Sequence, residues 1–224
     1  SPGQVSATDG ASACESCASG TYQSATGQTA CFDCPLGAFC RAGASAPTAC
    51  DSGSYRGLTG GQSQADCEAC PAGSACQQGS TGHTPCAPGT IAESTGQSAC
   101  SSCKAGSYQS AAGATACLAC GAGSYCKQGA TASLPCESGT HANSSGLKSA
   151  AECSTTAPGF FSPTGSVAQK ACAKGTIAPV AGLGACEQCA AGKRRASHAA
   201  KFNSPRLNSP QLECRAKLII SWPN

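Results

Sequence analysis

Residues 100–117 read C-S-S-C-K-A-G-S-Y-Q-S-A-A-G-A-T-A-C. The stretch opens with a C-x2-C pair, places Gly106 three residues after Cys103 and Tyr108 two residues later, and ends at Cys117, which begins the next C-x2-C. Glycine permits a turn with positive φ, and the Ser-Tyr step after it suits a short strand. The stretch therefore predicts a miniature hairpin closed by cysteines.

Variants of this pattern fill the chain from residue 14 to residue 192. The shared motif is C-x2-G-x-Φ, in which Φ is usually aromatic or β-branched. A compressed form has a further cysteine directly after Φ, and nine residues then lead to the next motif. Such internal repetition predicts small units in series, each packed on its neighbours. The full motif begins at Cys17, Cys50, Cys86, Cys103, Cys136 and Cys172, and the compressed motif begins at Cys34, Cys70 and Cys120.

Hydrophobic burial cannot be the main source of stability in this chain. Its 224 residues include five Phe, four Tyr, one Trp and no Met, but 21 Cys and 28 Gly. Few large side chains are present to contribute about 1.5–3 kcal/mol each on burial. The conformational entropy to be offset is roughly 1–2 kcal/mol per ordered residue. A cysteine content above about 8–10% is typical of a disulfide scaffold.

Disulfides persist in oxidising compartments. The sequence therefore predicts an extracellular or cell-surface location, reached through the secretory pathway, as part of a longer chain. The predicted fold class is small and disulfide-rich, mostly irregular with short β-hairpins. It is an elongated rod of tandem cysteine-rich repeats with little or no helix.

The simplest pairing rule joins each motif cysteine to the next cysteine along the chain. An interlocked pairing, such as Cys34 with Cys50, also remains open, because spacing alone does not determine connectivity. The sequential rule predicts Cys17–Cys31, Cys34–Cys40, Cys50–Cys67, Cys70–Cys76, Cys86–Cys100, Cys103–Cys117, Cys120–Cys126, Cys136–Cys153 and Cys172–Cys186.

Three cysteines fall outside this rule. Cys14 stands where a preceding loop would close, so its partner is expected before Ser1 and Cys14 is expected to be unpaired here. Cys189 opens a further motif with Gly192 and is a possible partner of Cys214.

One repeat lacks its cysteines. Residues 153–172 keep the motif as Thr156-Gly159-Phe161, with Thr in place of the opening cysteine. A closing cysteine three residues before Cys172 would fall at Gln169. Both members of the expected pair are thus absent together, as in a chain that avoids a lone thiol. A flexible joint is an expectation for this segment.

Composition and repeat phase divide the chain into five parts. Residues 193–224 carry seven of the fourteen Lys and Arg and lack the motif. The expected parts are an N-terminal extension (1–13), a first block of repeats (14–99), a second block (100–153), a degenerate repeat with the last repeats (154–192) and a C-terminal tail of different composition (193–224).

The sequence contains no grouping that indicates catalysis, so the protein is expected not to be an enzyme and to need no cofactor. The three His residues are isolated, and the eleven carboxylates are scattered. Zinc is a distant alternative, because C-x2-C pairs can ligate it, but here they form an unbroken series without His at ligand spacing. A net charge of +3 is too small to indicate nucleic acid. No apolar run of about 18–20 residues predicts a membrane span, and no small-molecule substrate is expected.

These motifs resemble the ephrin-receptor-like cysteine-rich repeats, also called GCC2 and GCC3 repeats, of the growth-factor-receptor, EGF-like and tumour-necrosis-factor-receptor-like group. The resemblance rests on C-x2-C-P-x-G, as at Cys31-F-D-Cys34-P-L-Gly37 and Cys67-E-A-Cys70-P-A-Gly73, and on A-P-G-F-F-S-P-T-G-S at 157–166. It implies an extracellular spacer or binding module whose partners are other extracellular or surface proteins.

Two functional classes are consistent with these observations. The first is a non-enzymatic structural spacer or protein–protein interaction segment of a secreted or cell-surface protein. The second is a fragment of a ligand-binding receptor ectodomain, which a patch of aromatic or charged side chains on adjacent repeats would favour. Asn143-Ser144-Ser145 is a glycosylation sequon in an expected surface loop.

Overall fold

The computed structural model describes residues 1–6 and 13–189. The chain forms two compact units. Unit 1 comprises residues 1–104, 108–118 and 128–132, and unit 2 comprises residues 105–107, 119–127 and those from 133 onward. Each repeat is named below by its opening residue, the first position of C-x2-G-x-Φ. The glycine of that motif is its first glycine, and the glycine of its return turn is its second glycine.

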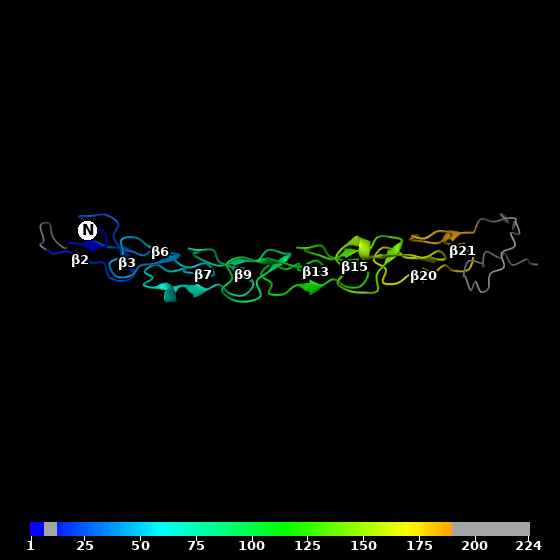
Figure 1. The fold of residues 1–224 in the computed structure, drawn as a ribbon, viewed down its shortest axis with the longest axis horizontal. Coiled ribbons are helices and arrows are strands. Elements are labelled where there is room, and N and C mark those ends of the chain that lie inside the picture. The colour runs from blue at the N-terminus through cyan, green and yellow to red at the C-terminus, as the bar shows by residue number, and fades with distance from the viewer. Residues whose placement is uncertain (7–12, 190–224) are drawn as a thin grey trace, which may run out of the picture. The chain divides into compact units, whose positions relative to one another are not determined.

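The regular structure of the described residues consists of two-residue strands joined as antiparallel pairs (Figure 1). In each repeat the strand after the first glycine pairs with a strand near the end of the repeat. The first twelve strands are β1 (Gln4–Val5) with β2 (Glu15–Ser16), β3 (Thr21–Tyr22) with β4 (Phe32–Asp33), β5 (Ala38–Phe39) with β6 (Thr48–Ala49), β7 (Ser54–Tyr55) with β8 (Glu68–Ala69), β9 (Ser74–Ala75) with β10 (Thr84–Pro85), and β11 (Thr90–Ile91) with β12 (Ser101–Ser102).

The same pairing continues along the chain. Helix in the described residues is confined to two short 3-10 turns, η1 (Gln64–Asp66) and η2 (Ala150–Glu152). The remaining strands are β13 (Ser107–Tyr108) with β14 (Leu118–Ala119), β15 (Ser124–Tyr125) with β16 (Leu134–Pro135), β17 (Thr140–His141) with β18 (Ser154–Thr155), β19 (Phe160–Phe161) with β20 (Lys170–Ala171), and β21 (Thr176–Ile177) with β22 (Glu187–Gln188).

These elements confirm the predicted fold class: small, disulfide-rich and irregular, with short hairpins and little helix. Strand β1 lies in the part expected to be an N-terminal extension, and its partner β2 lies at the start of the expected first block. Gly3, directly before β1, has φ of 79° and takes the place of a first glycine. Residues 1–6 and 13–16 thus adopt the structure of a repeat although residue 1 already lies past the opening position. The other predicted boundaries stay predictions.

Consecutive repeats are joined by a recurring set of four backbone hydrogen bonds. These bonds take the place of the sheet that the two-residue strands are too short to build, because they pair backbone groups that the strands leave without partners. Between the Cys34 and Cys50 repeats they run from Cys50 N to Gly37 O (2.9 Å), from Gly37 N to Arg56 O (2.9 Å), from Cys40 N to Gly61 O (2.8 Å) and from Gly60 N to Cys34 O (2.8 Å).

Contacts also reach the second repeat along. The first glycine of one repeat faces the carbonyl oxygen of the second glycine two repeats later, so closely that a Cβ would collide with that oxygen. Each repeat therefore packs against the next two. The glycine pairs are Gly3–Gly43, Gly20–Gly60, Gly37–Gly79, Gly53–Gly96, Gly73–Gly113, Gly89–Gly129, Gly106–Gly146, Gly123–Gly165 and Gly139–Gly182.

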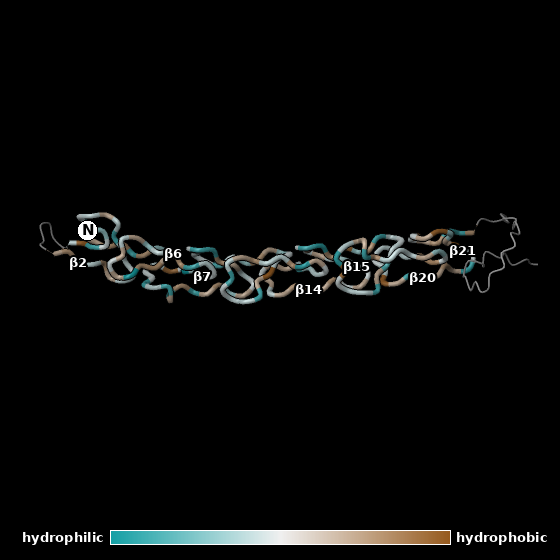
Figure 2. Tube along the Cα trace, viewed as in Figure 1, coloured by the Kyte–Doolittle hydropathy of each residue, from teal (hydrophilic) through white to brown (hydrophobic). Residues whose placement is uncertain are grey.

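The buried residues are mainly cystines and small side chains. Figure 2 shows hydrophobic residues scattered through each unit and not gathered in one segment. Tyr22 packs on the cluster that contains Cys34 and Cys40, and Tyr125 packs on the cluster that contains Cys136 and Cys153. At these two positions the prediction that Φ packs on the neighbouring disulfide is confirmed.

Candidate interaction surface

The residue directly after Φ, called here the interior position, determines how each loop is filled. Its side chain points into its own repeat and is buried in most of them. In the compressed repeats this residue is the second cysteine of the disulfide. The interior positions are Gln23, Cys40, Arg56, Cys76, Ala92, Gln109, Cys126, Ala142, Ser162 and Ala178.

Two repeats place a buried glutamine at the interior position. Gln23 is 1% exposed, and its Nε2 donates to the Ala30 carbonyl (2.7 Å) while its Oε1 accepts from the Ala25 N–H (3.0 Å). Gln109 makes the same two bonds with Ala116 and Ala111, at the same distances. A buried amide whose donor and acceptor are both used avoids the desolvation penalty of an unpaired polar group. The glutamine thus supports the loop from within.

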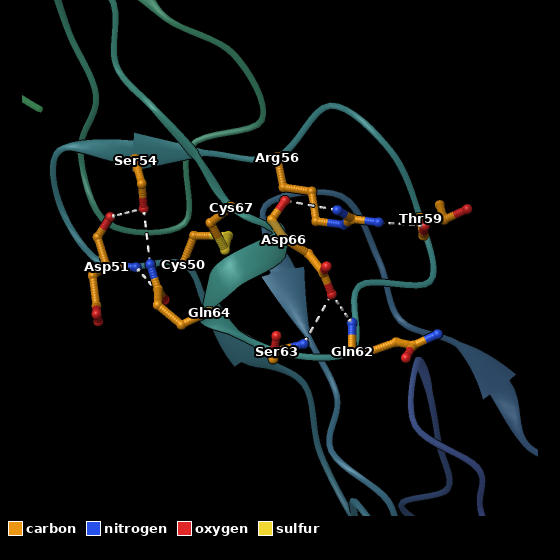
Figure 3. Close-up of a disulfide and its surroundings, with 10 residues drawn as sticks. All are labelled: Cys50, Asp51, Ser54, Arg56, Thr59, Gln62, Ser63, Gln64, Asp66 and Cys67. Atoms are coloured by element: carbon orange, nitrogen blue, oxygen red, sulfur yellow. Dashed lines mark hydrogen bonds between the residues drawn. A yellow bond between two sulfur atoms is a disulfide. The ribbon is translucent and has the colours of Figure 1, made fainter. Parts of the chain in front are cut away.

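The Cys50 repeat is longer, and Arg56 fills it (Figure 3). Its guanidinium donates to the Asp66 carbonyl (2.7 Å) and to the Thr59 carbonyl (3.2 Å). Gln64 of η1 joins the opposite side of the loop, because its Oε1 accepts from the Asp51 N–H (3.2 Å) and its Nε2 donates to Ser54 Oγ (3.2 Å). The loop is therefore ordered by hydrogen bonds of the Arg56 and Gln64 side chains, three of them to backbone groups.

The Asp66 carboxylate closes the turn before η1. Its Oδ2 accepts from the Gln62 N–H (2.7 Å) and the Ser63 N–H (3.0 Å). These two bonds, Gln62 first and then Ser63, lower the pKa of Asp66, and the nearby Arg56 charge adds to the lowering. Hydrogen bonds to the ionised form of a carboxyl favour that form.

A lowered folded pKa means that ionised Asp66 stabilises the loop above its ordinary pKa of about 3.9. That contribution is lost as the pH falls through the lowered folded value. We expect the acid unfolding curve of the Asp66→Asn variant to show a smaller loss of stability below about pH 4 than the wild type. Circular dichroism of both proteins along a pH series measures this. Identical slopes in the two proteins would contradict it.

The Cys136 repeat has a loop of the same length with a different filling. Ala142 occupies the interior position, and Leu147, 5% exposed, takes the place that Gly61 has in the Cys50 repeat. In the Cys50 repeat a Cβ on Gly61 would lie 2.7 Å from the Ala38 carbonyl oxygen and 2.7 Å from Arg56 Nε. The two loops thus use alternative fillings: each has one large and one small residue at these two positions.

This alternation predicts a favourable coupling between residues 56 and 61. Arg56→Ala removes the bonds to two carbonyls, and Gly61→Leu crowds Arg56, so each single change is expected to destabilise. The double variant reproduces the Ala142 and Leu147 arrangement and is expected to be less destabilised than the sum of the single changes, by about 0.5–3 kcal/mol. Urea unfolding of the four proteins measures this coupling. Strict additivity would contradict it.

Aromatic and charged side chains of adjacent repeats meet beside this loop. The Tyr55 hydroxyl donates to Glu68 Oε2 (2.7 Å), which raises the pKa of Tyr55, with burial and the Glu68 charge adding to the effect. The His83 ring lies edge-on to Tyr55, with ring centroids 5.7 Å apart, and His83 Nδ1 is 3.1 Å from Ser74 Oγ. Leu58, 69% exposed, lies on the same loop between Arg56 and Thr59. We call Tyr55 with its two partners Glu68 and His83, together with the exposed Leu58 of the same loop, the Tyr55 cluster.

Elsewhere the large exposed apolar side chains are distributed among different repeats. Phe32 lies near Tyr22, with ring centroids 6.1 Å apart. Scattered exposed apolar residues are ordinary for a protein surface. The others are Leu36, Leu118, Leu134, Val167 and Val180.

The described residues contain nine disulfides, with Cα–Cα distances of 5.6–6.1 Å. Each joins an opening cysteine to the next cysteine along the chain, so the pairing is sequential and not interlocked. Cys14 is exposed and free. Cys189 is disulfide-bonded, and its suggested partner, Cys214, lies outside the described residues.

The missing cysteine pair was assigned wrongly from the sequence. In the compressed repeats the opening cysteine bonds to the interior position, as in Cys120–Cys126, and not to a cysteine three residues before the next motif. The corresponding residues are Thr156 and Ser162, both 0% exposed. Gln169 instead accepts a hydrogen bond from the Ala157 N–H through Oε1 (2.9 Å).

Within residues 1–6 and 13–189, no group of three or more His, Cys, Asp or Glu side chains has the arrangement of a metal site. His141 is half-buried in β17, at the Φ position. In that same part of the chain no helix is long and apolar enough to cross a membrane. Asn143, Ser144 and Ser145 are all exposed.

Comparison with known proteins supports the repeat assignment. The family model of tyrosine-protein kinase ephrin type A/B receptor-like repeats matches residues 3–47 and 89–134, together less than half of the chain. No curated protein matches the chain significantly. The matched family consists of receptor ectodomain repeats and not of catalytic domains. The chain is a cysteine-rich repeat protein, and two stretches of it are similar to the ephrin receptor-like family.

Proposed function

We propose that this chain is a non-enzymatic extracellular module that acts as a structural spacer within a larger secreted or cell-surface protein. The observation that carries the proposal is the uninterrupted series of repeat-to-repeat backbone bonds, reinforced by a cystine in almost every repeat. Units that contact only near neighbours form extended arrays whose stability accumulates along their length. Such an array separates what lies at its two ends.

Small-angle X-ray scattering on the secreted, oxidised protein tests the spacer. A spacer requires an elongated particle whose maximum dimension falls in proportion when whole repeats are deleted. Deletion of residues 103–135, two complete repeats, is expected to shorten the particle without changing its cross-section. A compact particle, or one whose length does not respond to the deletion, would contradict the proposal.

A second candidate function is ligand binding, and the Tyr55 cluster is the observation that favours it. Its four side chains come from adjacent repeats and combine an aromatic ring, a carboxylate, an imidazole and an exposed leucine. Aromatic residues are enriched in the energetic centres of protein interfaces. If an extracellular partner binds here, Tyr55→Ala and Leu58→Ser should each weaken its binding at least about tenfold, by loss of roughly 1.4 kcal/mol or more.

The control is Leu118→Ser, which removes another exposed leucine (52%, against 69% for Leu58) away from the cluster. Binding of a panel of purified ectodomains to immobilised protein provides the measurement. A partner whose affinity changes with Leu118→Ser and not with the cluster variants would exclude this site.

We further propose that Asn143 carries an N-linked glycan in the secretory pathway. The sequon lies in the loop of the Cys136 repeat, and all three of its residues are exposed. The corresponding loop of the Cys50 repeat reads Gly57-Leu58-Thr59 and has no sequon. Protein secreted from eukaryotic cells should lose mass on treatment with peptide N-glycosidase, and Asn143→Gln should abolish that loss. An unchanged mass in the treated wild type would contradict the assignment.

A further inference from the structure

The repeat that begins at Thr156 belongs to the compressed type, with its cystine replaced. Six positions separate Thr156 from Ser162, as six separate Cys120 from Cys126. Nine residues lie between Ser162 and Cys172, as nine lie between Cys126 and Cys136. Two hydroxyl side chains therefore stand where the compressed repeats have two sulfur atoms.

The backbone of this repeat keeps the common arrangement. The Thr156 N–H donates to the Gly139 carbonyl (3.0 Å), the Ser162 N–H to the Leu183 carbonyl (3.0 Å), and the Gly182 N–H to the Thr156 carbonyl (2.9 Å). These bonds all reach other repeats. The folded form of residues 156–172 is therefore held by its own short hairpin and by bonds to its neighbours, and not by a covalent link of its own.

The interior of the repeat is the weak part. Thr156 and Ser162 are each 0% exposed, and neither Thr156 Oγ1 nor Ser162 Oγ has a hydrogen-bond partner among the described residues. A buried hydroxyl without a partner loses its hydration and gains nothing in exchange. Local opening of this repeat lets both hydroxyls form hydrogen bonds with water. Opening of a compressed repeat that has its cystine brings no such gain, because the two sulfur atoms are bonded to each other.

The lack of a covalent link also extends over an unusual length. Among the described residues no disulfide spans residues 154–171, between Cys153 and Cys172. In the three cystine-containing compressed repeats the corresponding stretches run only from 41 to 49, from 77 to 85 and from 127 to 135. The chain that can separate from its neighbours here is twice as long.

We propose that residues 154–171 form a release segment, the part of the array that opens first while the cystine-containing repeats on both sides stay folded. Segments of low local stability open independently of the rest of a protein and become accessible to proteases. Lys170, exposed in β20, lies within this segment, so an opened segment presents a lysine to cleavage. The inference depends on the repeat structure alone and holds whether or not the array is a spacer.

Limited proteolysis of the full chain with a lysine-specific protease, without reductant, tests the proposal. Lys127, also exposed, lies in the corresponding stretch of the Cys120 repeat. No described disulfide spans either lysine, so each cut separates two fragments. Cleavage after Lys170 should be at least about tenfold faster than after Lys127, because protease sensitivity follows the population of the opened form.

Two reciprocal variants sharpen the test. Thr156→Cys/Ser162→Cys, secreted under oxidising conditions, should form a further disulfide and slow cleavage after Lys170 at least about tenfold. Cys120→Thr/Cys126→Ser should give the Cys120 repeat the same defect and raise cleavage after Lys127 toward the wild-type rate at Lys170. Mass spectrometry of both variants verifies the number of free thiols.

Three results would overturn the inference. The first is cleavage after Lys170 that is no faster than cleavage after Lys127 in the wild type. The second is an unchanged rate of cleavage after Lys170 once the added disulfide has formed. The third is a folded double variant in which the two introduced cysteines remain as thiols. That result would show that residues 156 and 162 do not occupy the two cysteine positions of a compressed repeat.

Discussion

Gly53→Ala is expected to destabilise the protein by about 2 kcal/mol or more. Gly53 has φ of 86°, a backbone conformation that costs an L-residue roughly 1–2 kcal/mol. In addition, a Cβ at this position would collide with the Gly96 carbonyl two repeats away. Because the obstacle is backbone and not a flexible side chain, the repeats must move apart, and overpacking of this kind typically costs about 1–3 kcal/mol.

Two further glycines separate these contributions. Gly60 has φ of 71° but nothing within 4 Å of its Cβ position, so Gly60→Ala carries the conformational cost alone. Gly82 has neither a positive φ nor a close neighbour, so Gly82→Ala should change stability by less than about 0.5 kcal/mol. Urea unfolding of the three variants should rank them Gly53, Gly60, Gly82, from most to least destabilised. Equal losses for Gly53→Ala and Gly60→Ala would disprove the close contact between repeats.

Removal of the Cys103–Cys117 disulfide is the second change with a large expected effect. The bridge closes a loop whose ends are 14 residues apart, and cross-linking a loop of this size stabilises a fold by about 3 kcal/mol in the chain-entropy model. Cys103→Ser/Cys117→Ser should lower the stability of this repeat by about that amount. Both cysteines are changed, because a single replacement would leave a thiol able to exchange with the exposed Cys14.

The expected loss is local, since repeats in such arrays unfold as partly independent units. Hydrogen exchange of the amides of Tyr108 and Gln109 should therefore increase strongly, while those of Tyr22 and Gln23 in the Cys17 repeat should change little. The Cys17 repeat is a suitable reference because its disulfide has the same 14-residue separation and its Gln23 the same bonds as Gln109. Unchanged exchange at Tyr108 would show that the disulfide does not limit opening of its repeat.

Much of the fold can be predicted from residue spacing alone. Cysteine, glycine and Φ recur at fixed distances, and each favours one local feature. Cysteine provides a covalent link, glycine permits a positive φ, and Φ favours a strand. These local features predict hairpins, tandem repeats and cysteines paired in disulfides without reference to tertiary structure. The packing of Tyr22 and Tyr125 on a neighbouring cystine could be predicted on the same basis.

The contacts between repeats could not be predicted in this way. The first glycine of one repeat contacts the second glycine two repeats later. This contact depends on how successive hairpins stack, and a local sequence pattern does not predict that stacking. The interior position could not be recognised from residue type, because it is occupied by Gln, Cys, Arg, Ala and Ser, which have no chemistry in common. These residues have in common only that their side chains point into the repeat. The signal that could have revealed it is the position itself, one residue after Φ.

The error at Thr156 has the same origin. Gln169 occupies the place of a closing cysteine only when the repeat is aligned with those of the full motif, whose closing cysteine lies three residues before the next opening cysteine. Comparison with the compressed type places the lost partner at Ser162, whose burial and unpaired hydroxyl agree with that position. Two repeat types with one opening motif differ in the residue directly after Φ, and in this repeat the distinguishing cysteine is gone.

The glycine contacts bear on how such a protein can change in length. Every repeat offers the same two glycines to the repeats around it, whatever its loop contains. Loss or gain of a whole repeat by recombination therefore brings together surfaces that already fit, and no new interface has to arise. Loss of part of a repeat has no such freedom, because it would bring a residue with a Cβ to a position where only glycine fits against the facing carbonyl. The length of this chain is therefore expected to change in evolution by whole repeats.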